Sequence, residues 1–157
     1  MYILEVKTVQ SSVFRILIEA LKDILTDVNI IFDETGIKIM EMDQTHTVLV
    51  YLKLDKSKFE YYYCKKKQTV GISMINLFKL IKTMTNNDTL TLFIDEHVSD
   101  KLGIKIENGD KNSMTIYKLN LMDLNYDLFE IPPTTFNFVI TMPSIDFQKI
   151  CRDMNTI

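Results

Sequence analysis

Residues 121–154 have the sequence LMDLNYDLFEIPPTTFNFVITMPSIDFQKICRDM, in which three local patterns follow one another. The first part is polar and contains two adjacent prolines, which lack an N–H donor and interrupt helices and strands. Beyond the prolines, alternate residues of 136–142 are apolar, which predicts a strand. Ser144, a candidate N-cap, then opens an amphipathic segment that predicts a helix. The stretch therefore predicts an extended linker, a strand and a helix in succession.

The 120 residues that precede this stretch have the pattern of one α+β domain. Period-two alternation predicts strands at 2–7, 28–32, 37–42, 47–54, 59–64, 89–94, 103–107 and 113–119. Helices are predicted at 13–25, with Ser11 or Ser12 as N-cap, and at 74–84, with Ser73 as N-cap. A hairpin is predicted at Asp33-Glu34-Thr35-Gly36, because Gly36 can adopt a positive φ.

These patterns divide the chain into three parts. We expect an N-terminal domain at residues 1–120, a connector at 121–135, and the beginning of a second, similar domain at 136–157. The second domain would be cut short at Ile157, so we expect the natural protein to continue beyond it.

Composition limits the possible classes of protein. With 157 residues, 46% hydrophobic and 25% charged, the chain can bury a substantial core. It has no uncharged apolar run of about 18 residues, so we expect no membrane span. Cys64 and Cys151 are best interpreted as reduced thiols of a cytosolic or nuclear protein. The net charge of −3 argues against a generally basic nucleic-acid binder, but cations gathered on one face remain compatible with it.

Cations recur on the outward faces of the helical segments. An offset of 70 residues superimposes Lys79 on Lys149 and Lys82 on Arg152, which suggests a repeated strand–helix unit. The first helix carries Arg15 on the corresponding face, opposite an expected apolar stripe of Val13, Phe14, Leu17, Leu21 and Ile24. If these faces line one surface, they would follow a phosphate backbone without reading bases. The alternative is that they serve only solubility.

No catalytic constellation is present in the sequence. The four glycines are isolated, so there is no phosphate-binding loop. The two histidines and two cysteines lack the spacing of metal ligands. Cys64 precedes three lysines, a setting that could lower the pKa of its thiol. We expect no catalytic residue, no cofactor and no metal, although an unrelated α+β enzyme remains an alternative.

Five blocks of sequence, in order, resemble the eukaryotic-type DNA sliding clamps, the proliferating cell nuclear antigen family. The blocks are EALKDIL at 19–25, MDQTHTVLV at 42–50, KLNLMDL at 118–124, FEIP at 129–132, and MPS…FQKICRD at 142–153. The resemblance implies a clamp domain of antiparallel sheets with two helices on one face. Three chains, each of two such domains, would form a ring with the helices inside. The implied function is that of a DNA polymerase processivity factor that encircles duplex DNA.

The resemblance also implies which residues meet DNA and partners. The DNA channel would be lined by Arg15, Lys22, Lys79, Lys82, Lys149 and Arg152. A groove for short 3₁₀-helical peptides of polymerases, ligases and nucleases would be formed by Met42, His46, Leu49, Phe129, Ile131 and Pro132. Subunit contact would use an edge strand with Met114, Ile116 and Tyr117. The partners would be double-stranded DNA, these client enzymes, a clamp loader and two further copies of the chain.

Some positions depart from the family pattern. Ile16 stands where a second basic residue is common, and Tyr126, Phe129 and Glu130 differ in size or charge from the usual residues. Peptide preference and channel charge are therefore expected to differ from those of other family members. A truncated clamp-like module that binds partner peptides without encircling DNA is the alternative function. The expected location is the nucleus, or a cytoplasmic replication site if the protein is viral.

Overall fold

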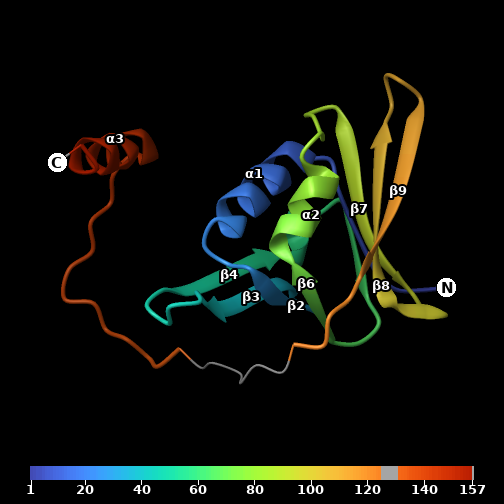
Figure 1. Cartoon of the computed structure of the whole chain (residues 1–157), viewed down its shortest axis with the longest axis horizontal. Coiled ribbons are helices and arrows are strands. Elements are labelled where there is room, and N and C mark those ends of the chain that lie inside the picture. Colours follow the sequence, from blue (N-terminus) through green and yellow to red (C-terminus); the bar gives the residue numbers. More distant parts are fainter. Residues whose placement is uncertain (125–130, 157) are drawn as a thin grey trace.

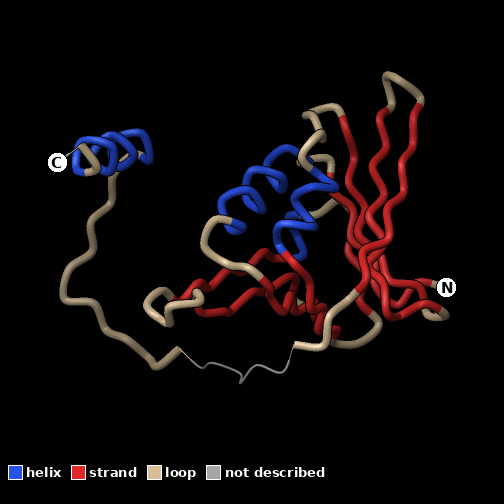
Figure 2. Tube along the Cα trace, in the orientation of Figure 1, coloured by secondary structure: helices blue, strands red, loops and turns tan. Residues whose placement is uncertain are grey.

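The structure is a computed structural model that describes residues 1–124 and 131–156. Its strands form two antiparallel sheets, with two helices lying next to one another beside them (Figures 1 and 2). The first sheet has the order β5 (Tyr61–Cys64), β1 (Tyr2–Thr8), β7 (Asp88–Asp95), β8 (Val98–Asn108), β9 (Ser113–Asn120). The second has the order β4 (Leu49–Asp55), β3 (Gly36–Met42), β2 (Asp27–Asp33), β6 (Gln68–Ser73). The α+β class and the antiparallel pairing predicted from the sequence are confirmed.

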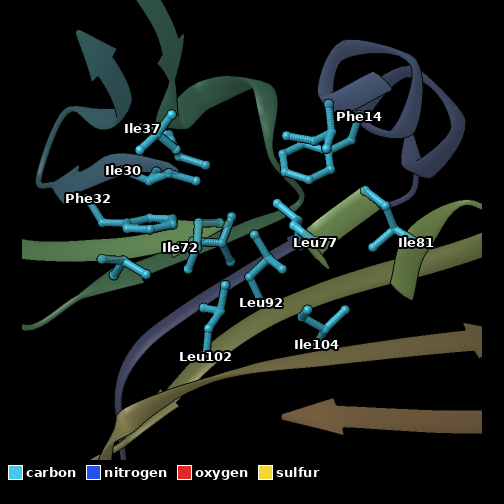
Figure 3. Close-up of a cluster of buried hydrophobic side chains, with 14 of the residues drawn as sticks. Phe14, Ile30, Phe32, Ile37, Ile72, Leu77, Ile81, Leu92, Leu102 and Ile104 are labelled. Atoms are coloured by element: carbon cyan, nitrogen blue, oxygen red, sulfur yellow. The ribbon is translucent and has the colours of Figure 1, made fainter. Parts of the chain in front are cut away.

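One hydrophobic core joins both sheets to the helices α1 (Ser11–Lys22) and α2 (Met74–Ile81). Figure 3 shows side chains from β2, α2, β7 and β8 that meet in it, among them Phe32, Leu77 and Leu92. Phe32 is only 1% exposed. Because the inward residues of both sheets contact the same helices, the domain buries one continuous apolar layer.

The hairpin between β2 and β3 depends on its glycine, as predicted. Gly36 has φ of 143°, a region that side-chain-bearing residues rarely adopt. A Cβ atom there would lie 2.0 Å from the carbonyl oxygen of Leu54 on β4. The turn thus lets β3 start directly against β4, and it fixes the register of β2 against β3.

The two helices follow the predictions to different degrees. α2 begins as predicted, with the Ser73 hydroxyl accepting a hydrogen bond from Asn76 N at 3.4 Å. Neither serine caps α1, because Ser11 is buried and donates to the carbonyl of Thr85 at 2.8 Å, which leaves Gln10 as N-cap.

The apolar stripe predicted for α1 was partly wrong. Val13 is 61% exposed and Ile24 is also exposed, whereas Ile18 is buried. The helix packs against both a sheet and α2, so its buried stripe is displaced toward Phe14, Ile18 and Leu21. A helical wheel drawn from the sequence of α1 alone does not take the contact with α2 into account.

The chain beyond the connector contains one helix, α3 (Ser144–Met154), as predicted. Ser144 is not its cap, because Pro143 takes the N-cap position. The strand predicted at 136–142 does not form. A strand needs a neighbour for its backbone N–H and C=O groups, and no other described segment pairs with these residues. A helix satisfies its own backbone, so α3 forms without such a partner, and its apolar side chains are exposed: Phe147, Ile150, Cys151 and Met154.

Candidate peptide groove and nucleic-acid interface

An apolar strip lies on the face of the second sheet that points away from the core. β3 and β4 pair in a register that sets Met42 opposite Leu49 and Met40 opposite Tyr51. These positions alternate with the core residues Ile39 and Leu52, so all four side chains share the outer face. We refer to Met40, Met42, Leu49 and Tyr51 as the outer strip. A methionine-rich surface of this kind adapts to differently shaped apolar partners.

A tight loop after β3 brings His46 to one end of this strip. The Asp43 carboxylate accepts hydrogen bonds from Thr47 N and Val48 N, each at 2.8 Å, and from the hydroxyl of Thr45. These hydrogen bonds hold the pKa of Asp43 well below its usual range, and the bond from the Thr45 hydroxyl has the largest effect on that pKa. His46 has φ of 55° at the tip of the loop, where its N–H donates to Asp43 O at 3.0 Å.

A cavity of about 170 Å³ lies between this loop and the beginning of β2. It is lined by Thr26, Asp27, Glu41, Met42, Asp43, Gln44 and His46. The structure therefore brings Met42 and Leu49 together across the β3–β4 pair, and the loop 43–48 that joins them carries His46.

The connector begins against the same sheet. Met122 N donates to Gly71 O at 2.8 Å, which forms an isolated antiparallel bridge along the free edge of β6. A Cβ atom on Gly71 would lie 2.2 Å from the carbonyl oxygen of Met122, so only glycine permits this approach. Asn29 Nδ2 donates to Leu124 O at 3.1 Å. Figure 1 shows the connector leaving β9 and running along the β6 and β2 side of the sheet.

The groove residues predicted on the connector are only partly described. Ile131 and Pro132 are exposed. Phe129, with its neighbours Tyr126 and Glu130, lies outside the described residues. Sequence reasoning missed Asn29, which fastens the connector, and an isolated strand glycine was the only available signal for this contact.

The predicted DNA-facing cations fall into two groups. Lys79 and Lys82 on α2 are exposed, and within the described part of the chain neither forms an ion pair. On α1, Arg15 lies 3.7 Å from the Glu19 carboxylate. Because α2 carries its cations without neighbouring acids, we expect it to attract phosphate more strongly than α1.

Lys22, the second cation of α1, is held by two neighbours. Its Nζ contacts Asp23 at 2.6 Å and lies 5.1 Å above the ring of Phe78 on α2. Ile16, at the position where the family often has a basic residue, is exposed on this helix. On α3, Lys149 and Arg152 are exposed beside Asp146 and Asp153.

The predicted subunit edge lies at the end of the first sheet. β9 pairs with β8 on one side, and no other described strand pairs with its second side. Met114, Ile116 and Tyr117 all have exposed side chains on this strand. A regular strand with a free edge and apolar side chains is suited to pairing with a strand of another chain.

Other sites considered from the sequence show no such organisation. In the described ranges no three His, Cys, Asp or Glu side chains are placed to hold a metal ion. Across those same residues, no helix is both long and apolar enough for a membrane crossing. Burial raises the pKa of the Cys64 thiol, so the lowering that the neighbouring lysines could have caused is not seen.

The fold and these surfaces define a clamp-type α+β domain. The chain belongs to the family described as proliferating cell nuclear antigen, N-terminal domain, whose family model matches residues 3–129. It is 34% identical over 152 residues to "Probable DNA polymerase sliding clamp 1" of Paramecium bursaria Chlorella virus 1, covering 97% of this chain and 58% of that protein. It is 31% identical over 153 residues to "Proliferating cell nuclear antigen" of Dictyostelium discoideum, covering 98% and 59%. The chain thus spans less than two thirds of the length of these relatives.

Proposed function

We propose that this chain is part of a DNA polymerase sliding clamp, which encircles duplex DNA and tethers replication and repair enzymes through a hydrophobic groove. The observation that carries the proposal is the outer strip, where Met42 and Leu49 lie opposite one another and Met42 lines a cavity with His46. A client peptide would place apolar anchors on this strip while the connector covers its other side. The role is that of a scaffold, without chemistry of its own.

A synthetic peptide provides the direct test of the groove. We use "probe peptide" for a short fluorescein-labelled peptide in which leucine is followed three residues later by two phenylalanines. This spacing places the anchors on one face of a 3₁₀ turn. Saturable binding in fluorescence anisotropy would support the groove, and its absence would reject it. The alternative, a module that binds peptides without encircling DNA, would show peptide binding but no retention on circular DNA.

Reversing both exposed cations of α2, in Lys79→Glu with Lys82→Glu, should weaken retention on DNA. Loss of two phosphate contacts should reduce the slope of log affinity against log salt by about 2. Salt titration of binding to duplex DNA by the natural full-length protein would measure this slope. The matched control is Lys66→Glu with Lys67→Glu, which changes net charge equally at exposed positions in the loop between β5 and β6. Equal losses in both variants would show that only net charge matters.

We propose that β9 pairs with a neighbouring chain to close a ring of three. Tyr117→Ala should then weaken the assembly about tenfold or more, because a partly exposed aromatic at a strand edge is a typical interface anchor. Light scattering after size exclusion of the natural full-length protein would report its mass. Tyr63→Ala, a similarly exposed tyrosine on β5, is the control and should leave the mass unchanged. An unchanged assembly in Tyr117→Ala would count against this edge.

The family and its named relatives support location at a site of DNA replication. We propose the nucleus, or a cytoplasmic replication site if the gene is viral. The clients would be polymerases, ligases, nucleases and a clamp loader that share the groove.

A further inference from the structure

We propose that Asn29 and Glu41 form a latch that fastens the start of the connector to the second sheet, and that they are positioning residues for peptide capture. We use "latch" for these two residues together with the connector atoms they hold. The inference rests on the proposed groove, because its consequence for clients requires that the groove binds them. Neither residue is part of the outer strip.

The latch begins where β2 and β3 separate. These strands pair from Ile30 to Asp33 of β2, so the N–H of Asn29 has no backbone partner on β3. The Glu41 carboxylate takes that place, with Oε1 accepting from Asn29 N at 2.9 Å. Glu41 is only 6% exposed, although a carboxylate is seldom buried without a specific partner. Burial raises the pKa of Glu41, and the hydrogen bond from Asn29 partly opposes that shift.

With its backbone held by Glu41, Asn29 directs its side chain to the connector. Its amide donates to Leu124 O at 3.1 Å, while Met122 N donates to Gly71 O at 2.8 Å. Asn29 and Gly71 are directly opposite one another in the β2–β6 pair. The connector is therefore held at two points two residues apart, from two neighbouring strands.

This attachment limits where the rest of the connector can reach. Ile131 follows Leu124 by seven residues, which span at most about 25 Å when fully extended. Glu41 also lines the cavity that contains Met42 and His46, so the latch and the groove share a wall. Fixing one side of a binding groove before the peptide arrives lowers the ordering cost of binding.

The test compares Asn29→Ala with Thr69→Ala in the chain as it stands. Thr69 is exposed two residues from Gly71, on the same face of β6 as Gly71. It takes no part in the hydrogen bonds that hold Met122 and Leu124. Two quantities are measured: the exchange rate of the Met122 amide proton by NMR, and the affinity for the probe peptide. Asn29→Ala should exchange faster and bind the peptide about three- to tenfold more weakly, the range expected for one hydrogen bond. Thr69→Ala should change neither.

Glu41 provides a second test through a conservative variant. Glu41→Gln keeps an acceptor oxygen for Asn29 N and should retain slow exchange at Met122, whereas Glu41→Ala removes the acceptor and should lose it. Retention of slow exchange in both Glu41→Ala and Asn29→Ala would overturn the latch. Faster exchange with unchanged peptide affinity would overturn its positioning role. If the unaltered chain binds no probe peptide, the proposed groove fails, and the exchange rates alone decide the latch.

Discussion

Ile131→Asp should reduce the affinity of the chain for the probe peptide at least about 100-fold, because the side chain belongs to the connector wall of the proposed groove. Burying an isoleucine against a peptide contributes about 1.5–3 kcal/mol, which the substitution removes. It also places a carboxylate where an apolar anchor would cover it, and a buried charge without a partner is strongly disfavoured. Ile131 is 44% exposed, so the change should affect binding far more than folding.

Ile140→Asp is the matched control for this prediction. Ile140 is 81% exposed in the same C-terminal region, and it was not assigned to the groove. Fluorescence anisotropy should show normal binding by this variant and nearly complete loss by Ile131→Asp. A thermal melt of each variant would establish that both remain folded. Equal affinities of the two variants would remove Ile131 from the groove and place the connector wall elsewhere.

Most of the strands could be predicted because their signals are local. Alternation indicates the face of each residue, and the glycine turn at Gly36 fixes which residues of β2 and β3 lie opposite one another. The family resemblance assigned Met42 and Leu49 to the groove, and the β3–β4 register places them opposite one another on the outer face. The family resemblance supplied their role, which the residues alone did not determine.

The errors share one physical cause, which is that tertiary neighbours are absent from a local pattern. The face of α1 depends on α2, so Ile18 is buried where the helix alone suggested Val13. The latch depends on the separation of β2 from β3, and nothing near Asn29 in sequence indicates that separation. Residues 136–142 alternate as a strand should, but alternation cannot supply the neighbour that a strand needs.

The two groups of cations show how the structure refines a sequence prediction. Lys79 and Lys82 stand without acids on their exposed face, whereas Arg15 and Lys22 are each next to a carboxylate. Surface pairs of this kind contribute little to stability, but they reduce the local positive potential. Charge reversal on α2 is therefore expected to affect DNA retention more than the same change on α1.

Phe32→Ala should lower the free energy of unfolding by about 3–5 kcal/mol, the usual cost of deleting a buried phenylalanine. Phe32 is 1% exposed, and it lines the core beside Leu77 of α2 and Leu92 of β7 (Figure 3). The phenyl ring of Phe32 therefore fills space between the second sheet, the first sheet, and the helix that carries Lys79 and Lys82. A domain of this size is stable by about 5–15 kcal/mol, so the loss is a large fraction of the total.

Urea denaturation followed by circular dichroism would measure this change, with Phe138→Ala as the matched control. Phe138 is 89% exposed, so the same chemical deletion should alter the free energy of unfolding by less than about 0.5 kcal/mol. The cavity should also loosen the contact between the sheet that bears the groove and the helix that bears the cations. At urea concentrations near the unfolding midpoint of Phe32→Ala, this variant should consequently lose peptide affinity and DNA retention together. Ile131→Asp should lose only peptide affinity. Similar unfolding energies for Phe32→Ala and Phe138→Ala would mean that the two sheets do not share one core.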